Sequence, residues 1–206
     1  MLSAIPNADL LLAPLTTQEA VLSSQIEGTR VTMSEVMEIE AGGTPTGVTK
    51  WKYDDAEEIL NYRYTLWNCA NEIKKRPISQ HMIHQVHAML MRGVRGRDKS
   101  PGEYRKEQNW IGKAGSPINE ASFIPITPEH LASGMEVWND YVNSISTINP
   151  IVKLAVIHIE FEALHPFLDG NGRLGRMLIP LYLFQEKILG SPSLAPASKI
   201  SDIHAM

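Results

Sequence analysis

The sequence predicts an all-α protein that is mostly helical and carries one short β-hairpin. Helical signals recur along most of the chain, with capping residues, first-turn acidic residues and apolar stripes at helical spacing. One stretch, residues 93–128, lacks that spacing and holds two short strand-like pieces. The chain has 206 residues, of which 43% are hydrophobic, so one domain with a sizeable core is expected.

The N-terminal part predicts a helix over residues 15–40. Thr16 or Thr17 is the expected N-cap, with Glu19 in the first turn. Gly28 stands near the middle of this range, and we expect it to break or end the helix because glycine weakens helix interiors.

The next two helices have clearer ends. After a loop over residues 41–47, residues 51–75 place acidic side chains in the first turns and basic ones at the end, which matches the helix dipole. Pro77 ends this helix. Ser79 then caps a helix over residues 79–92 with its own apolar stripe.

The remaining elements follow the irregular stretch. A hairpin is expected near residues 108–126, where NWIG and ASFIPI are the strand-like pieces. Helices are expected over 128–145 and 150–163, each with a proline at its start. A final helix is expected to begin near Arg173 and run to about Leu189.

Composition excludes several protein classes. The net charge is −4, so the overall composition does not show the excess of basic residues that is typical of nucleic-acid-binding proteins. The only cysteine, Cys69, excludes an internal disulfide and a cysteine-based zinc cluster. No run reaches the ~18 apolar residues of a membrane helix. The apolar N-terminal stretch is short, lacks a basic start and is interrupted by Asp9, so we expect no signal peptide and a cytoplasmic protein.

Residues 165–176, with the sequence HPFLDGNGRLGR, carry the strongest chemical signal. The DGNG turn leads into a helix, and Gly170 and Gly172 allow backbone conformations in which successive N–H groups form an anion-binding nest. Arg173 and Arg176 lie three apart in the first turn of that helix. Because cations there oppose the helix dipole, a negative group such as a polyphosphate is expected beside them.

Two further residues of this loop suit transfer chemistry. Asp169 offers the oxygen ligand that Mg²⁺ on a nucleotide prefers. His165 stands at the start of the loop and can take a proton at neutral pH. DGNG alone is compatible with an ordinary turn and a solvated basic face. Together with both arginines, these residues favour phosphoryl or nucleotidyl transfer.

The same stretch resembles the signature of the Fic family, HPFx(D/E)GNGRxxR, at every fixed position. The resemblance implies a mostly helical fold and transfer of AMP from ATP to a hydroxyl side chain of a target protein. It makes His165 the catalytic base, Phe167 the residue that packs the loop into the core, and Asp169 the Mg²⁺ ligand. The nucleotide-binding positions that it implies are Gly170, Asn171, Gly172, Arg173, Gly175 and Arg176.

The resemblance extends upstream and covers about residues 15–190. ASFIPITP is similar to the family's flap, a hairpin that holds the target's extended segment by strand-like pairing. The implied target-binding residues of the flap are Ser122, Phe123 and Ile124.

A second motif lies far upstream, where SSQIEG spans residues 23–28. From the residues alone, Glu27 is a surface glutamate near a helix end. The segment resembles the family's inhibitory motif, (S/T)xxxE(G/N), which would pair Glu27 with Arg176 and include Ser23. A carboxylate there occupies the charge meant for the γ-phosphate, so ATP would bind with its α-phosphate misaligned for attack.

Other constellations allow competing interpretations. His158, Glu162 and His165 are spaced i, i+4, i+7, which suits a metal site, although we expect the helix to end before His165 and the other two to pack behind the loop. The basic run 92–106 is interpreted as a solvated loop in which Arg105 positions the flap. A surface face is expected for three further histidines, His81, His84 and His87.

The sequence therefore predicts a protein adenylyltransferase, a nucleotidyltransferase that moves AMP from Mg-ATP to a Ser, Thr or Tyr hydroxyl of a target protein or of itself, inhibited by Glu27. The alternatives are AMP removal alone or in addition, transfer of another phosphate-containing group, and a catalytically weak nucleotide-binding regulatory module. The expected partners are ATP, Mg²⁺ and the target protein. The sequence is compatible with a homodimer, and we expect binding to neither a membrane nor a nucleic acid.

The predicted organisation has three parts. Residues 1–40 form an N-terminal segment with the inhibitory helix, and residues 41–190 form the catalytic core. Residues 191–206 are expected to form an irregular tail in place of the aromatic-rich helix usual in the family. A natural truncation, a frameshift and an unusual member of the family are the alternative explanations.

Overall fold

A computed structural model describes residues 8–43, 49–93, 98–113 and 115–189, with side chains described from Thr16 onward. These ranges hold seven α-helices and one short 3₁₀ turn, and no β-strand forms within them. The predicted all-α class is confirmed. The predicted tail, residues 191–206, lies outside the described residues. None of the described helices combines the length and apolar content needed to cross a bilayer.

Two helices replace the single one predicted over residues 15–40. They are α1 (Ala8–Ile26) and α2 (Met33–Glu40). Gly28 lies between them in the left-handed region with φ +93°, which confirms the expected break. The N-cap prediction was wrong, since α1 begins at Ala8 and both Thr16 and Thr17 lie inside it.

The other predicted helices are present within a few residues of their expected ends. They are α3 (Lys50–Ile73), α4 (Gln80–Leu90), α5 (Pro128–Asn143), α6 (Pro150–Leu164) and α7 (Asn171–Gln185). Ser79 caps α4 as predicted, because its hydroxyl accepts a hydrogen bond from the backbone N–H of Met82. Local capping signals therefore place most of the helix ends.

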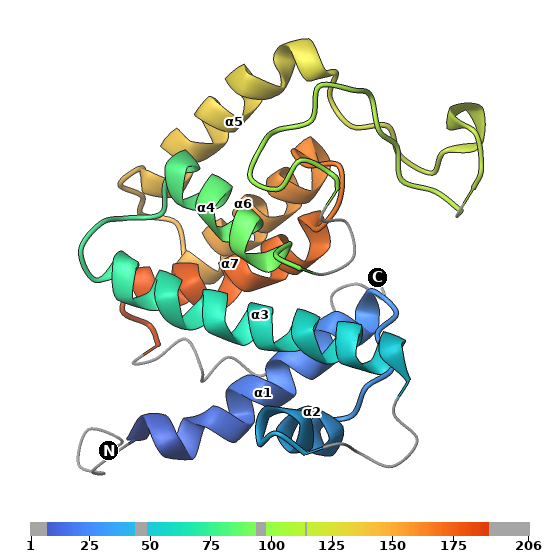
Figure 1. The fold of residues 1–206 in the computed structure, drawn as a ribbon. Coiled ribbons are helices and arrows are strands. Elements are labelled where there is room, and N and C mark those ends of the chain that lie inside the picture. The colour runs from blue at the N-terminus through green and yellow to red at the C-terminus, as the bar shows by residue number, and fades with distance from the viewer. Residues whose placement is uncertain (1–7, 44–48, 94–97, 114, 190–206) are drawn as a thin grey trace.

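Helix α3 crosses the middle of the molecule and divides it into two layers (Figure 1). Helices α1 and α2 pack on one side of it, and α4 and α7 pack on the other. Helix α6 packs against both α5 and α7. The apolar core is continuous across the layers, and its largest fully buried side chains include Tyr62, Phe161, Phe167 and Tyr182. Helix α7 thus lies in the interior, with its first turn close to α1, α3 and α4.

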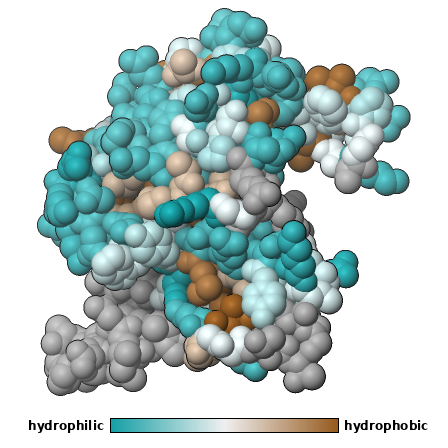
Figure 2. All heavy atoms as spheres, viewed as in Figure 1, coloured by the Kyte–Doolittle hydropathy of each residue, from teal (hydrophilic) through white to brown (hydrophobic). Residues whose placement is uncertain are grey.

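The β-hairpin predicted near residues 108–126 is not observed as strands. One antiparallel bridge joins Ile111 to Phe123, and the chain returns through the 3₁₀ turn η2 (Ile118–Glu120). Pro125 lacks the N–H that the next bonded pair with Asn109 would need, and the Ala121 N–H donates to the Ile118 carbonyl in the turn, which limits the pairing to this bridge. The segment protrudes from the body and presents exposed apolar side chains, Phe123 among them (Figures 1 and 2).

Replacing Phe161 in α6 tests the core. Its ring is fully buried and lies 5.5 Å from that of Trp138 between centroids. We expect Phe161→Ala to lower the free energy of unfolding by about 3–5 kcal/mol, since it leaves a cavity. The control is Ile159→Ala on the same helix, where the side chain is 63% exposed and a change within about 0.5 kcal/mol is expected. Urea denaturation measures both, and equal effects would contradict this packing.

Candidate active site

The loop between α6 and α7 turns sharply at both ends. His165 follows the last residue of α6 and adopts the left-handed conformation, with φ +46°. Gly170, immediately before α7, is also left-handed, with φ +77°. An added Cβ at Gly170 would lie 2.8 Å from the Met91 sulfur, so glycine is required there. These two turns present the loop at the N-terminus of α7.

Asn171 fastens the loop from inside. Its side-chain oxygen accepts a hydrogen bond from the Phe167 N–H at 2.9 Å, and its side-chain N–H donates to the Phe167 carbonyl at 2.8 Å. The Phe167 ring is fully buried and stacks on the ring of His87 at 3.7 Å. The Asn171 side chain is therefore engaged within the loop, which leaves its backbone N–H as the group for an anion.

Helix α4 holds the loop from outside through His87. The Gly102 N–H donates to Nδ1 of His87, so the protonated Nε2 donates to the Asp169 carbonyl at 2.8 Å. Burial lowers the pKa of His87 to about 4. The prediction of a surface face for His81, His84 and His87 was wrong for His87, which is fully buried. The helical spacing could not show that this position faces the loop.

Arg105 braces the loop against the protruding segment. It is buried, and its Nε–H donates to the His165 carbonyl at 2.9 Å. A further guanidinium N–H donates to the Ile126 carbonyl at the base of the predicted flap. Asn109 adds a bond from its side chain to the Phe167 carbonyl at 3.1 Å. Arg105 thus connects the loop with the flap region, as the sequence interpretation expected, although its side chain is buried and not solvated.

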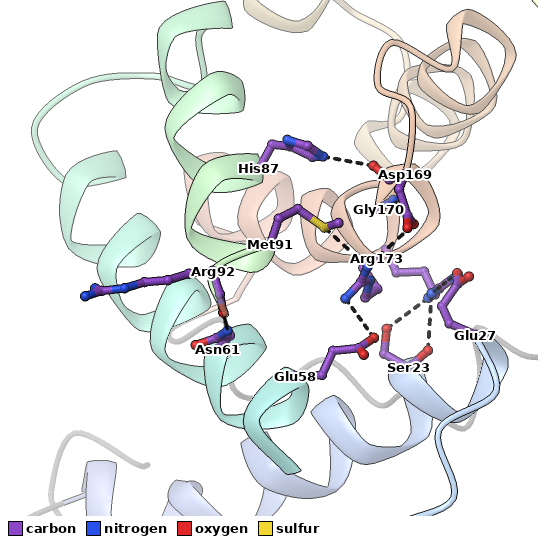
Figure 3. Close-up of polar contacts among 11 residues, drawn as sticks. Ser23, Glu27, Glu58, Asn61, His87, Met91, Arg92, Asp169, Gly170 and Arg173 are labelled. Carbon is purple, nitrogen blue, oxygen red and sulfur yellow. Dashed lines mark hydrogen bonds and ion pairs between the residues drawn. The ribbon is translucent and has the colours of Figure 1, made fainter. Parts of the chain in front are cut away.

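Arg176 forms the contact that the inhibitory motif implies. Its Nη2 lies 2.6 Å from Oε1 of Glu27, and its Nε–H donates to the Ser23 hydroxyl at 2.9 Å. Ser23 lies in the last turn of α1, and Glu27 follows the helix directly (Figure 3). An added Cβ at Gly172 would lie 2.4 Å from the Glu27 carboxylate, so the glycine makes room for this ion pair.

Arg173 is held by a residue that the sequence analysis missed. Its Nη1 lies 2.7 Å from Oε1 of Glu58 in α3, and both side chains are almost completely buried. Its Nη2 lies 3.3 Å from the Met91 sulfur and 3.7 Å from Oδ1 of Asp169 (Figure 3). Glu58 belongs to no motif, and only its place on a largely buried face of α3 could have drawn attention to it.

The residues behind the loop pack tightly. His158 Nδ1 lies 3.1 Å from the Gly175 carbonyl, and an added Cβ at Gly175 would lie 2.1 Å from Oε1 of Glu162. Gly175 therefore has a packing contact with α6. Burial raises the pKa of Glu162 to about 7, an effect that Arg176 opposes and Glu27 reinforces. No three potential metal ligands gather at one point among the described side chains, these included.

His165 has the electrostatics of a neutral base. Burial lowers the pKa of its imidazole, and the charge of Arg105 acts in the same direction. The Glu162 carbonyl and the carboxylates of Glu27 and Asp169 oppose that shift. Nδ1 of the ring is buried without a hydrogen-bond partner among the described residues. The imidazole is thus held in the form that can accept a proton.

The donor set suits a magnesium-bound polyphosphate. Arg173 keeps a buried Nε–H that has no hydrogen-bond partner among the described residues, which is a donor left for an anion. The Asp169 side chain is 44% exposed, and its Oδ1 accepts from the Gly170 N–H at 2.6 Å. Proteins usually bind the Mg²⁺ of a nucleotide through one or two carboxylates together with the phosphates of the nucleotide. One accessible carboxylate beside groups that can donate to phosphates fits that arrangement.

The three predicted flap residues lie on the protruding segment. Phe123 and Ile124 are exposed, and the Ser122 N–H donates to the Ile111 carbonyl at 2.8 Å. The structure shows no contact between these three side chains and His165 or the arginines among the interactions of the described residues. Their connection with the loop runs through Arg105 at Ile126.

Comparisons with known proteins agree on one family. A profile of the Fic/DOC family matches residues 77–183, and a profile of the Fic/DOC N-terminal region matches residues 1–71. A probable protein adenylyltransferase from Aquifex aeolicus is 28% identical over 176 residues, which are 85% of this chain and 50% of that protein. Protein adenylyltransferase Fic from Drosophila erecta is 29% identical over 163 residues, 78% of this chain and 30% of that protein. The chain thus spans half or less of the length of these curated relatives.

A solved structure with a Fic domain has a similar fold. The crystal structure of a Fic-domain-containing signalling protein from Bacteroides thetaiotaomicron superposes with a TM-score of 0.78 at 21% identity. The superposition covers 99% of this chain and 75% of that one. At this identity the likeness concerns the helical fold alone.

The raised pKa of Glu162 predicts how stability depends on pH. Because the fold favours the protonated acid, this group's stabilising contribution is full below pH 4.5 and is lost as the pH rises through about 7. We expect Glu162→Gln to raise the free energy of unfolding relative to the unsubstituted chain near pH 8 and to leave it unchanged near pH 4. Urea titrations at both values measure this difference. Glu160→Gln, an exposed position of the same helix, is the control, and a matching pH dependence there would refute the assignment.

Proposed function

The chain belongs to the Fic/DOC family, and we propose on that premise that it is a protein adenylyltransferase. It transfers AMP from Mg-ATP to a Ser, Thr or Tyr hydroxyl of a target protein or of itself. The observation that carries the proposal is the pair of buried arginines, Arg173 and Arg176, in the first turns of α7 beside His165. A buried cationic pair at the positive end of a helix is suited to a polyphosphate.

The reaction needs His165 as the base. The target hydroxyl gives its proton to the neutral imidazole while its oxygen attacks the α-phosphorus of ATP. The bond from the α-phosphorus to the bridging oxygen breaks, and pyrophosphate leaves toward Arg173 and Arg176. The lowered pKa of His165 keeps the imidazole unprotonated and ready for this step at neutral pH.

The loop supplies the binding of the phosphates. The backbone N–H groups of Asn171 and Gly172 belong to the first turn of α7, where the helix dipole favours anions. The Gly170 N–H donates to the Asp169 carboxylate in the structure described, and in this proposal it joins the other two when the phosphates bind. Asp169 would hold Mg²⁺, with its exposed carboxylate as the ligand. When bound, Mg²⁺ neutralises charge on the phosphates. The fixed loop keeps these groups in place before ATP arrives, which favours the transition state.

Glu27 acts as the inhibitor in this proposal. Its ion pair with Arg176, supported by Ser23, occupies the guanidinium that would bind the γ-phosphate. ATP then binds with its α-phosphorus out of line with the attacking hydroxyl. The protein is inhibited until α1 withdraws this carboxylate. Ser122, Phe123 and Ile124 hold the target segment in this proposal, and the location of the protein is cytoplasmic.

Labelling with α-³²P-ATP and Mg²⁺ tests this function. We expect label on protein with Glu27→Gly, and at least about 100-fold less with Glu27→Gly/His165→Ala, because a positioned base contributes at least that factor. The unsubstituted chain is expected to be weakly labelled. Autoradiography after electrophoresis measures all three. If ATP binds to Glu27→Gly and no label transfers to itself or to lysate proteins, the nucleotide-binding module is favoured and the enzyme is refuted.

The pH profile of Glu27→Gly tests the role of His165 independently. Because the pKa of His165 lies below its usual 6.5, the neutral base persists in mildly acidic solution. We expect kcat/KM for labelling to fall only below pH 6.5. An acid midpoint above 6.5, in a profile from pH 5 to 8, would rule out His165 in the environment described above.

A further inference from the structure

Arg173 lies between two carboxylates that differ in their distance from it, in their exposure and in the element that carries them. Glu58 reaches it from α3 at 2.7 Å, whereas Asp169 of the loop lies 3.7 Å away. The Glu58 side chain is 2% exposed, and the Asp169 side chain is 44% exposed (Figure 3). One guanidinium therefore faces a buried carboxylate from the scaffold and an accessible carboxylate from the loop.

A buried guanidinium requires an anionic partner. Removing one member of a buried ion pair leaves an uncompensated charge, which is strongly unfavourable. Arg173 is confined on a third side by the Met91 sulfur, which lies 3.3 Å from its Nη2. Among the ion pairs of the described residues, the carboxylates within reach of Arg173 are those of Glu58 and Asp169. Without Glu58, Arg173 would turn to Asp169.

We propose that Glu58 is a positioning residue that holds Arg173 on the α3 side and thereby leaves the Asp169 carboxylate free to bind the divalent cation of the nucleotide. This inference rests on the proposed function, since it assigns Asp169 the cation of Mg-ATP. Glu58 touches neither substrate nor metal and acts through Arg173.

The geometry also explains why Glu58 does not simply neutralise Arg173. A guanidinium carries five donors, and Glu58 approaches it at Nη1. The buried Nε–H remains without a partner among the described residues and is available to a phosphate. Glu58 lies within the segment that the N-terminal family profile matches, residues 1–71. That segment therefore completes the nucleotide site, in addition to carrying Glu27.

A double-mutant cycle on stability tests the inference without any nucleotide. Asp169→Asn keeps the bond from the Gly170 N–H, and we expect it to change the folding equilibrium constant little in the unsubstituted chain. In the Glu58→Gln chain, where Arg173 relies on Asp169, we expect the same change to lower that constant by about tenfold more. Urea denaturation measures the four proteins. Equal effects of Asp169→Asn in both backgrounds would overturn the proposal.

Two variants secure this cycle. Glu57→Gln, at the adjacent exposed position of α3, is the matched control, and Asp169→Asn should cost the same there as in the unsubstituted chain. Glu58→Asp serves if Glu58→Gln does not fold, because the shorter acid retains the charge and lengthens the ion pair. The coupling with Asp169→Asn should then have the same sign, and its absence would count against the proposal.

Calorimetry of ATP binding provides the functional readout. In EDTA, we expect Glu58→Gln to bind ATP with an affinity within about twofold of the unsubstituted chain. We expect the increase in ATP affinity on addition of Mg²⁺ to be about tenfold smaller in this variant, because Glu58 and Asp169 are coupled through Arg173. An equal loss in EDTA and in Mg²⁺ would mean that Glu58 supports the fold alone and would overturn the proposal. Absence of ATP binding by the unsubstituted chain would refute the proposed function and with it the cation role of Asp169, whereas the stability cycle would still show whether Glu58 holds Arg173 away from Asp169.

Discussion

The burial of two guanidinium groups at the start of α7 is the constraint on which the rest of the structure depends. Arg173 and Arg176 are each 4% exposed, and both lie where the helix dipole is positive. Burying cations there is strongly unfavourable unless carboxylates compensate them. Glu27, directly after α1, and Glu58 of α3 provide this compensation. Helices α1 and α3 must therefore pack directly against α7, and they do.

The loop before α7 must stay rigid so that its groups keep a fixed position relative to the Arg173 and Arg176 guanidinium groups. Asn171 fixes it from inside, His87 holds its Asp169 carbonyl from α4, and Arg105 holds its His165 carbonyl from the irregular segment. The His87 tautomer follows from the Gly102 N–H, so this contact has one direction only. A loop fixed in this way loses little free energy to reorganisation when a ligand binds, which is how preorganised donors favour a transition state.

Sequence reasoning succeeded where the signal is local or belongs to a motif. The helix that Ser79 caps and the Glu27–Arg176 contact are both present. It failed where long-range packing decides the outcome. The hairpin needed pairing that Pro125 and the turn at residues 118–121 prevent. The Glu58–Arg173 ion pair joins residues that are far apart in the sequence and share no motif. The domain boundary at residue 40 stays a prediction.

The two ion pairs of α7 differ in a way that suits different tasks. Glu27 is 39% exposed, so water and salt screen its attraction to Arg176, and an incoming phosphate can compete for that guanidinium. Glu58 is 2% exposed, and separating it from Arg173 would strand two charges in the interior. One arginine is therefore open to exchange between a carboxylate and a phosphate, while the other stays fixed. The same part of α7 thus combines an accessible ion pair with a buried one, and exposure of the carboxylate, rather than distance, separates the two.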